Sequence, residues 1–253
     1  MKKPLERRTL PTSFITGSTS GDQSFENQDG IVYQRHIRGI APADNGGFVF
    51  TGYNHIYAID SQGEILWEKT YGDGVGIAES IDGGYVIANK IVLKIDPEGN
   101  ILWNKTLLDI EGSRIAAITQ SSEGGHVLVG QVSCGIFITM IDDNGNQVWE
   151  KVYGGEHGDT AYSVVESDDG GFVIAGSTCS YGPEPGGETM GYLIKVDASG
   201  EFVWHMTYGG YGTWAEKIIP LEDGYIAVGG KAFTNEKDSW WEKWYIVKIN
   251  PET

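Results

Sequence analysis

The sequence predicts an all-β protein, a single five-bladed β-propeller built from four-stranded antiparallel blades. Three observations support this prediction. Two short motifs alternate along the chain, apolar runs of strand length separate them, and no segment shows sustained helical periodicity. The chain repeats units of four short strands at intervals of roughly 35 to 55 residues, which is the sequence signature of a propeller.

The first motif is an Asp, a Gly three positions later and a Trp four positions beyond that. Its copies are Asp60–Gly63–Trp67, Asp96–Gly99–Trp103, Asp142–Gly145–Trp149 and Asp197–Gly200–Trp204. The Asp predicts a type I turn in which its side chain accepts backbone N–H groups, and the Gly supplies a left-handed conformation. Strand-forming residues flank each turn, so the motif predicts a hairpin with Trp as an apolar anchor on the departing strand. Calcium binding by DDNGN (142–146) is the alternative, but the hairpin already explains every acidic residue of the motif.

The second motif is a polar residue, Gly-Gly and a short apolar run that often begins with an aromatic residue or His. It stands at 45–52, 82–89, 123–130 and 169–176, with a degenerate copy at 223–230. An apolar stretch precedes each copy. One unit is therefore strand A, a Gly-Gly turn, strand B, a variable loop, strand C, the Asp turn and strand D with its Trp.

Four units contain all four strands and begin near Gly39, Gly74, Arg114 and Thr160, whereas the fifth, from Trp214, supplies only strands A to C. We expect residues 27–37, NQDGIVYQRHI, to be the missing strand D, with Tyr33 in the Trp position. Strand 31–37 would then pair antiparallel with strand 244–249 and close the ring, which removes open sheet edges. This gives an N-terminal extension, 1–26, and a propeller domain, 27–253. Six blades are the alternative, if TSFITGSTS (12–20) belongs to an extra blade.

These motifs resemble the tryptophan-motif repeats of propellers related to pyrroloquinoline quinone dehydrogenases, especially their short uncharacterised archaeal and bacterial relatives. The resemblance covers residues 27–253 and implies the fold. It does not extend to a calcium- and quinone-binding set of residues, so we expect no cofactor and no metal. Five-bladed propellers include glycosidases and sugar-binding lectins, which are similar to this chain in architecture alone.

The composition constrains the partners. The 253 residues include 18 basic and 35 acidic side chains, a formal net charge of −17. An acidic surface repels phosphate groups, so we exclude nucleic acid and anionic membranes. No apolar run is long enough to span a membrane. The first residues are basic without an apolar stretch behind them, so we expect a cytoplasmic protein; secretion is the alternative if a signal peptide has been removed. We also expect a monomer.

Two cysteines, Cys134 and Cys179, lie near the ends of strand B in adjacent units, one residue out of register. We expect two free, mostly buried thiols in a reducing compartment. A disulfide between them is the alternative.

The variable loops indicate where a ligand could bind. The A–B and C–D turns are nearly uniform and share one face, so we expect that face to be structural, whereas the D–A and B–C loops of the other face vary. Variable loops on a rigid scaffold commonly hold function. We expect a shallow pocket there, at the channel mouth, between loops 180–190 and 232–243. Its expected contributors are Arg38, Arg114, Asp159, Trp214, Lys217 and Trp241.

Two functions fit this pocket. Exposed aromatic residues suit a glycan or a protein partner, which predicts a non-enzymatic recognition module. Loop carboxylates near His or Arg suit a carbohydrate hydrolase or lyase, which is the alternative. The inner-strand positions Gly39, Gly76, Ala117 and Ser163 are small and neutral, and only Lys217 adds charge, expected in or near the channel. Because glycosidases of this architecture have inner-strand carboxylates, the pattern favours recognition.

Overall fold

The computed structural model describes residues 24–26, 32–34, 37–52, 54–72, 74–89, 91–107, 113–184, 186–234 and 240–250, and for 24–26, 32–34, 234, 240 and 241 only the backbone. The described residues form 21 strands and no helix. Every strand pair is antiparallel, as the sequence predicts.

Five sheets follow one another along the chain. Blade one is β3 (Gly39–Pro42), β4 (Phe48–Thr51), β5 (Ile56–Ile59) and β6 (Ile65–Lys69). Blade two is β7 (Gly76–Glu79), β8 (Tyr85–Ala88), β9 (Val92–Ile95) and β10 (Ile101–Lys105). Blade three is β11 (Arg114–Gln120), β12 (His126–Val132), β13 (Gly135–Ile141) and β14 (Gln147–Tyr153). Blade four is β15 (Asp159–Glu166), β16 (Phe172–Thr178), β17 (Met190–Val196) and β18 (Phe202–Tyr208), and blade five is β19 (Thr213–Leu221), β20 (Gly224–Thr234) and β21 (Trp240–Ile249).

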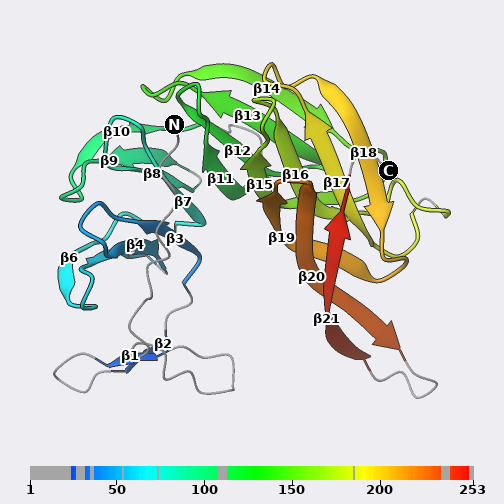
Figure 1. The fold of residues 1–253 in the computed structure, drawn as a ribbon, viewed down its shortest axis with the longest axis horizontal. Coiled ribbons are helices and arrows are strands. Elements are labelled where there is room, and N and C mark those ends of the chain that lie inside the picture. The colour runs from blue at the N-terminus through cyan, green and yellow to red at the C-terminus, as the bar shows by residue number, and fades with distance from the viewer. Residues whose placement is uncertain are drawn as a thin grey trace.

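The blades are arranged around an open arc, with blade one and blade five at its two ends (Figure 1). The first strand of each blade contacts the first strand of the next, so β3, β7, β11, β15 and β19 line the inner side. Apolar side chains fill the space between successive sheets. The groups are Ala41, Val49, Ile77 and Tyr85 between blades one and two, and Val127, Ile138, Phe172 and Ile194 between blades three and four.

The predicted closure of the ring is wrong in this structure. β2 (Val32–Gln34) pairs with β1 (Ser24–Glu26), in the register Ser24↔Gln34, and not with β21. Five sheets agree with the predicted blade count, but the last has three strands, and β20 is the one described strand that pairs with β21. A physical reason is loop length: residues 27–31 alone connect β1 to β2, whereas pairing with β21 closes a loop of roughly 200 residues at a greater entropy cost.

The Asp motif forms the predicted turn. Asp142 Oδ1 accepts the N–H groups of Asn144 and Asn146 at 2.9 and 2.8 Å, and the Gly145 N–H donates to the Asp142 carbonyl at 2.9 Å. Gly145 has φ 74°, and a β-carbon there would lie 2.7 Å from the Trp103 ring of the blade before. The glycine is therefore needed both for its conformation and for the space that Trp103 occupies.

The repeated Trp joins neighbouring blades. Trp67, Trp103 and Trp149 donate their indole N–H to the carbonyl oxygens of Pro97, Asp143 and Ala198, in the Asp turn of the next blade, at 3.0, 3.0 and 3.2 Å. Each Trp thus packs on the following turn and also satisfies one of its carbonyl groups. The predicted role as an apolar anchor is confirmed for these three.

Both cysteines are free thiols in this structure. Cys179 is half-buried, and burial raises the pKa of its thiol. Cys134 is exposed, which corrects the expectation that both are mostly buried, because it lies in the short turn between β12 and β13.

Candidate functional site

Asp159 is the most fully partnered of the predicted site residues. Its side chain is buried, Oδ1 accepts the Thr178 hydroxyl at 2.5 Å, and Oδ2 accepts the Ser180 hydroxyl and the Gly155 N–H, both at 2.8 Å. These bonds tie the loop that enters β15 to the loop that leaves β16. The structure therefore gives Asp159 a structural role in shaping the variable face, and a direct role in binding stays a prediction.

Arg38, Arg114 and Trp214 lie at the starts of inner strands in three different blades. Arg38 precedes β3 and Arg114 begins β11, and both are exposed. Trp214, in β19, is half-buried and donates its indole N–H to Glu216 Oε1 at 3.1 Å. The structure thus spaces these side chains along the arc, one in each of blades one, three and five.

Lys217 lies on the inner strand β19, and the equivalent positions of the other blades show which way it faces. Lys217 pairs with Val228 of strand B. The residues at the same strand A position in blades one to four are Gly39, Gly76, Ala117 and Ser163, and their strand B partners are Thr51, Ala88, Val129 and Ala175. A β-carbon on Gly39 would meet the Gly76 Cα at 3.1 Å, and the Ser163 hydroxyl accepts the Ile218 N–H at 3.4 Å. This position therefore faces the next blade, which explains its small residues. Lys217 is exposed because the described chain has no blade beyond blade five.

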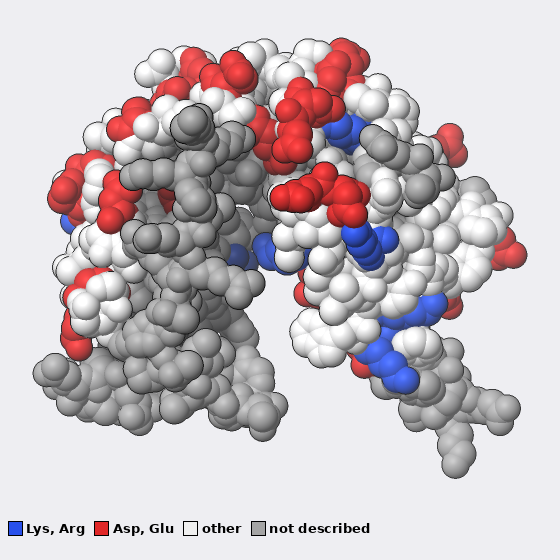
Figure 2. Space-filling model, viewed as in Figure 1, with Lys and Arg blue, Asp and Glu red and all other residues white. Residues whose placement is uncertain are grey.

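Trp241 belongs to β21, the outer strand of blade five, and its side chain is outside the described set. The neighbouring residues expose apolar surface: Trp244 is 83% exposed and Ile246 is 67% exposed. Lys231 and Lys243 flank the Phe233 ring at 5.8 and 5.5 Å from its centroid. Asp and Glu are spread over the visible surface, whereas Lys and Arg are fewer and several lie at this end of the arc (Figure 2).

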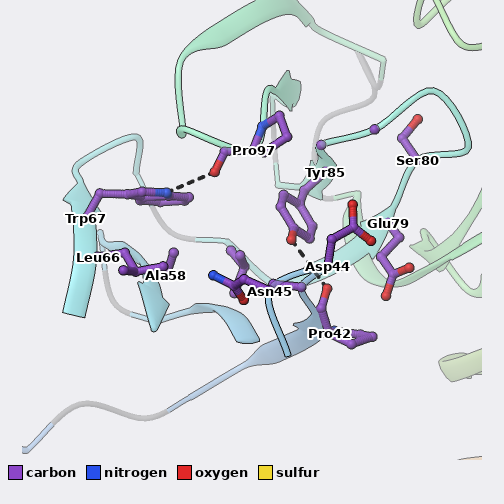
Figure 3. Close-up of a pocket in the computed structure, with 14 residues that line it drawn as sticks. Pro42, Asp44, Asn45, Ala58, Leu66, Trp67, Glu79, Ser80, Tyr85 and Pro97 are labelled. Carbon is purple, nitrogen blue, oxygen red and sulfur yellow. Dashed lines mark hydrogen bonds between the residues drawn. The ribbon is translucent and has the colours of Figure 1, made fainter. Parts of the chain in front are cut away.

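A pocket of about 190 Å³ lies between blades one and two, on the face of the Gly-Gly and Asp turns. Val49, Ala58 and Tyr85 line its apolar part, and Trp67 lies beside Pro97, to which it is hydrogen-bonded (Figure 3). The carboxylates of Asp44 and Glu79 lie together on one side of the Tyr85 ring (Figure 3). Because the uniform turns predict a structural role for this face, the pocket is not foreseen from the sequence.

Burial and negative charge in this pocket raise the pKa of Glu79 and of Tyr85. Burial, and then the negative charge of Asp44, raises the pKa of the Glu79 carboxyl. Burial, then Glu79 and Asp44, raises the pKa of the Tyr85 hydroxyl, which donates to the Pro42 carbonyl at 3.3 Å. Neither carboxylate has a hydrogen-bond donor among the described residues. The pocket therefore has an excess of negative charge that the described residues leave uncompensated.

A family profile described as "Outer membrane protein assembly factor BamB" matches residues 15–182. The chain belongs to this family of propeller repeat proteins. The family resemblance stated from the sequence motifs is thereby confirmed. No curated protein matches the chain.

Solved structures similar to this BamB-like chain show the same fold at low sequence identity. A protein of unknown function from Bacteroides caccae aligns with a TM-score of 0.56 and 14% identity, over 85% of this chain and 81% of that one. The WD40 domain of Neurospora crassa Pan2 aligns with a TM-score of 0.57 and 14% identity, over 88% and 69%. The WD40 propeller domain of Doa1 aligns with a TM-score of 0.55 and 15% identity, over 86% and 70%.

No three His, Cys, Asp or Glu side chains within the described ranges are grouped so that they could hold a metal ion. In the same part of the chain, no helix is of a length and apolarity that would cross a bilayer.

Proposed function

We propose that this propeller is a non-enzymatic interaction scaffold, and that its partner is a protein that adds an extended segment to β21. The observation that supports this is that β21 lies at the edge of its sheet. β21 is ten residues long, and among the described strands it pairs with β20 alone. The outer side of such a strand presents unpaired backbone N–H and C=O groups, which a polypeptide in extended conformation can satisfy.

The side chains beside this edge support a protein partner. Trp244 and Ile246 expose large apolar surfaces on the same side of the sheet, and Ile219 of β19, two strands away, is 48% exposed. Burying apolar and aromatic surface of this kind stabilises protein interfaces, and Trp is frequent among the residues that contribute most. A glycan, the other ligand class predicted from the sequence, cannot continue a β-ladder, so the edge favours a polypeptide.

The variable face is continuous with this edge. β20 and β21 have eleven and ten residues, against seven in β16 and β17, so the fifth blade's hairpin extends farther at its B–C end. Trp241, one of the predicted binding residues, lies in that extension. A partner strand along β21 would therefore also contact the variable face, where we propose that binding specificity resides.

A synthetic peptide tests the proposal. The capped sequence QVWEKVY, residues 147–153, is the outer strand of blade three and occupies there the position that is open in blade five. We expect it to bind and to slow backbone amide exchange in residues 244–249, while a scrambled peptide does neither. Trp244→Ala should weaken binding by about tenfold or more, since that is the loss expected of a central interface Trp. The exposed Leu102, changed to Ala, is the matched control and should leave binding unchanged.

Two results would overturn the proposal. Peptide-induced protection that maps to other strands would place the binding surface elsewhere. Full protection of residues 244–249 in the protein alone would mean that the edge is already occupied, either by the chain's own N-terminal segment or by a second copy. Diluting the protein separates those two occupants, because only protection by a second copy falls with protein concentration.

A further inference from the structure

The pocket between blades one and two exists because one repeated position holds a small residue. In strand C of blades one to four, one position pairs with a Val of strand B on one side and with the motif Trp of strand D on the other. This position is Ala58 in blade one, Lys94 in blade two, Met140 in blade three and Lys195 in blade four. A long side chain fills the equivalent space at the other three interfaces. At the first interface Ala58 leaves it open.

At two of these interfaces the chain places an ammonium group at the Gly-Gly turn. Lys94 is 2% exposed and its Nζ lies 2.5 Å from Asp82 Oδ1. Lys195 is 4% exposed and its Nζ lies 2.6 Å from Asp169 Oδ1, with the Ser167 hydroxyl as a second partner. The repeat is therefore a scaffold that accommodates a buried ammonium on an alkyl chain at this location.

The third interface shows how the repeat satisfies a carboxylate when no lysine is present. Glu166, the last residue of β15, accepts the Ser122 N–H at 2.9 Å and the hydroxyls of Ser122 and Ser121 at 2.9 and 3.3 Å. Glu79 is the last residue of β7 and has the same register position, since it pairs with Tyr85 as Glu166 pairs with Phe172. The Gly-Gly turn that faces Glu79 is that of blade one, and it has Ala43 and Asp44 where blade three has the two serines. Glu79 therefore meets a like charge in place of three hydrogen-bond donors.

At the first interface this strand C position therefore holds no ammonium, and two carboxylates have no donor among the described residues. Tyr85 and Trp67 add aromatic surface next to the alkyl slot left by Ala58 (Figure 3). Aromatic faces attract cations, and an opposite charge stabilises two neighbouring carboxylates. The volume of about 190 Å³ is smaller than the roughly 300–1,000 Å³ of pockets that hold whole small-molecule ligands. Its size suits a single side chain.

We propose that this pocket binds a primary ammonium group on an alkyl chain, the lysine side chain of a partner protein, between Asp44 and Glu79. The alkyl stem lies along Tyr85 in the space that Ala58 leaves, and the ammonium neutralises the two carboxylates. The site is in blades one and two, so it does not depend on binding at β21.

The probe is Nα-acetyl-lysine N-methylamide, whose side-chain ammonium is its one charge, and the norleucine analogue is its uncharged match. Binding is followed through the Trp67 indole N–H resonance, identified by its loss in Trp67→Phe. We expect a millimolar dissociation constant for the lysine probe and at least tenfold weaker binding of the norleucine analogue. Butylamine binding tenfold more tightly than the lysine probe would contradict the assignment to a partner's lysine and indicate free alkylamines.

Several variants test whether the ammonium binds between Asp44 and Glu79, so that the test does not fail if one of them does not fold. Ala58→Lys supplies the ammonium from within, as Lys94 and Lys195 do, and should abolish probe binding. Ala58→Met, the residue of blade three, should fill the slot and abolish it as well. Glu79→Gln, at an exposed position, should weaken binding at least fivefold, whereas Glu166→Gln, the equivalent carboxylate of blade four, should leave it unchanged. Wild-type binding by folded Ala58→Lys, or equal binding of the two probes, would overturn the proposal.

Discussion

His126 shows how one residue of a repeat can make stability depend on pH. It is buried between blades two and three at the position of Tyr85 and Phe172, and its Nε2 lies 2.8 Å from the Glu79 carbonyl oxygen. Nδ1 is buried and has no hydrogen-bond partner among the described residues. Burial lowers the pKa of the imidazole below its ordinary value of 6.5, because the charged form is poorly solvated there.

The sign of this shift gives the first prediction. The unfolded chain takes up the proton more readily than the folded one, so stability is greatest above pH 6.5 and falls as the pH drops below that value. His126→Phe, the residue of blade four, should remove this part of the decline. The measurement is the free energy of unfolding from pH 8 to pH 5, compared between the two proteins. Parallel curves for wild type and variant would contradict the assignment.

The second prediction concerns the repeated Trp. Trp103→Ala should lower the free energy of unfolding by about 3–5 kcal/mol, because it removes a large ring between two blades. It also leaves the Asp143 carbonyl without its indole donor. Leu102→Ala is the control on the same strand: Leu102 is 57% exposed, so the change should cost only about 0.5 kcal/mol. Denaturant unfolding measures both, and equal losses would show that Trp103 is not an anchor.

At the scale of the element, the turns were predictable because each has a local physical requirement. The Gly-Gly turns illustrate this: Gly125 has φ 73°, and a β-carbon there would lie 2.1 Å from the Ile141 carbonyl oxygen of the adjacent strand. A glycine that recurs at the same position of each turn indicates such a steric requirement directly. The pocket was not predictable in the same way, because its signal is a departure from the repeat: Ala58 stands where other blades have Lys or Met, and it has meaning only once the strands are in register.

The third prediction tests the turn. Gly125→Ala should destabilise the protein by roughly 2 kcal/mol or more, since it combines a left-handed conformation with a backbone clash. Gly158→Ala is the matched control, because a β-carbon there meets nothing within 4 Å. Thermal unfolding of both variants measures the difference. A Gly125→Ala protein as stable as Gly158→Ala would contradict the account of the second glycine.

For the whole molecule, the sequence predicts five repeated units but not that the arc stays open between blades one and five (Figure 1). Each blade packs only on its neighbours, so the order of the units follows from local patterns. Pairing of residues 32–34 is a choice between a near strand and a distant one, and both choices preserve the alternation of residues. The direction of Lys217, expected in or near the channel, met the same limit, because only the packing of the inner strands shows that its position faces the next blade.

Whether β21 is an open edge is tested most directly by amide hydrogen exchange of the protein alone. The comparison is between residues 244–249 of β21 and residues 191–196 of β17, which occupies the same place in blade four and pairs with strands on both sides. The account predicts that alternate amides of 244–249, those on the unpaired side, exchange much faster than the amides of β17. Uniform slow exchange along both strands would contradict it, because a further strand would then cover the edge.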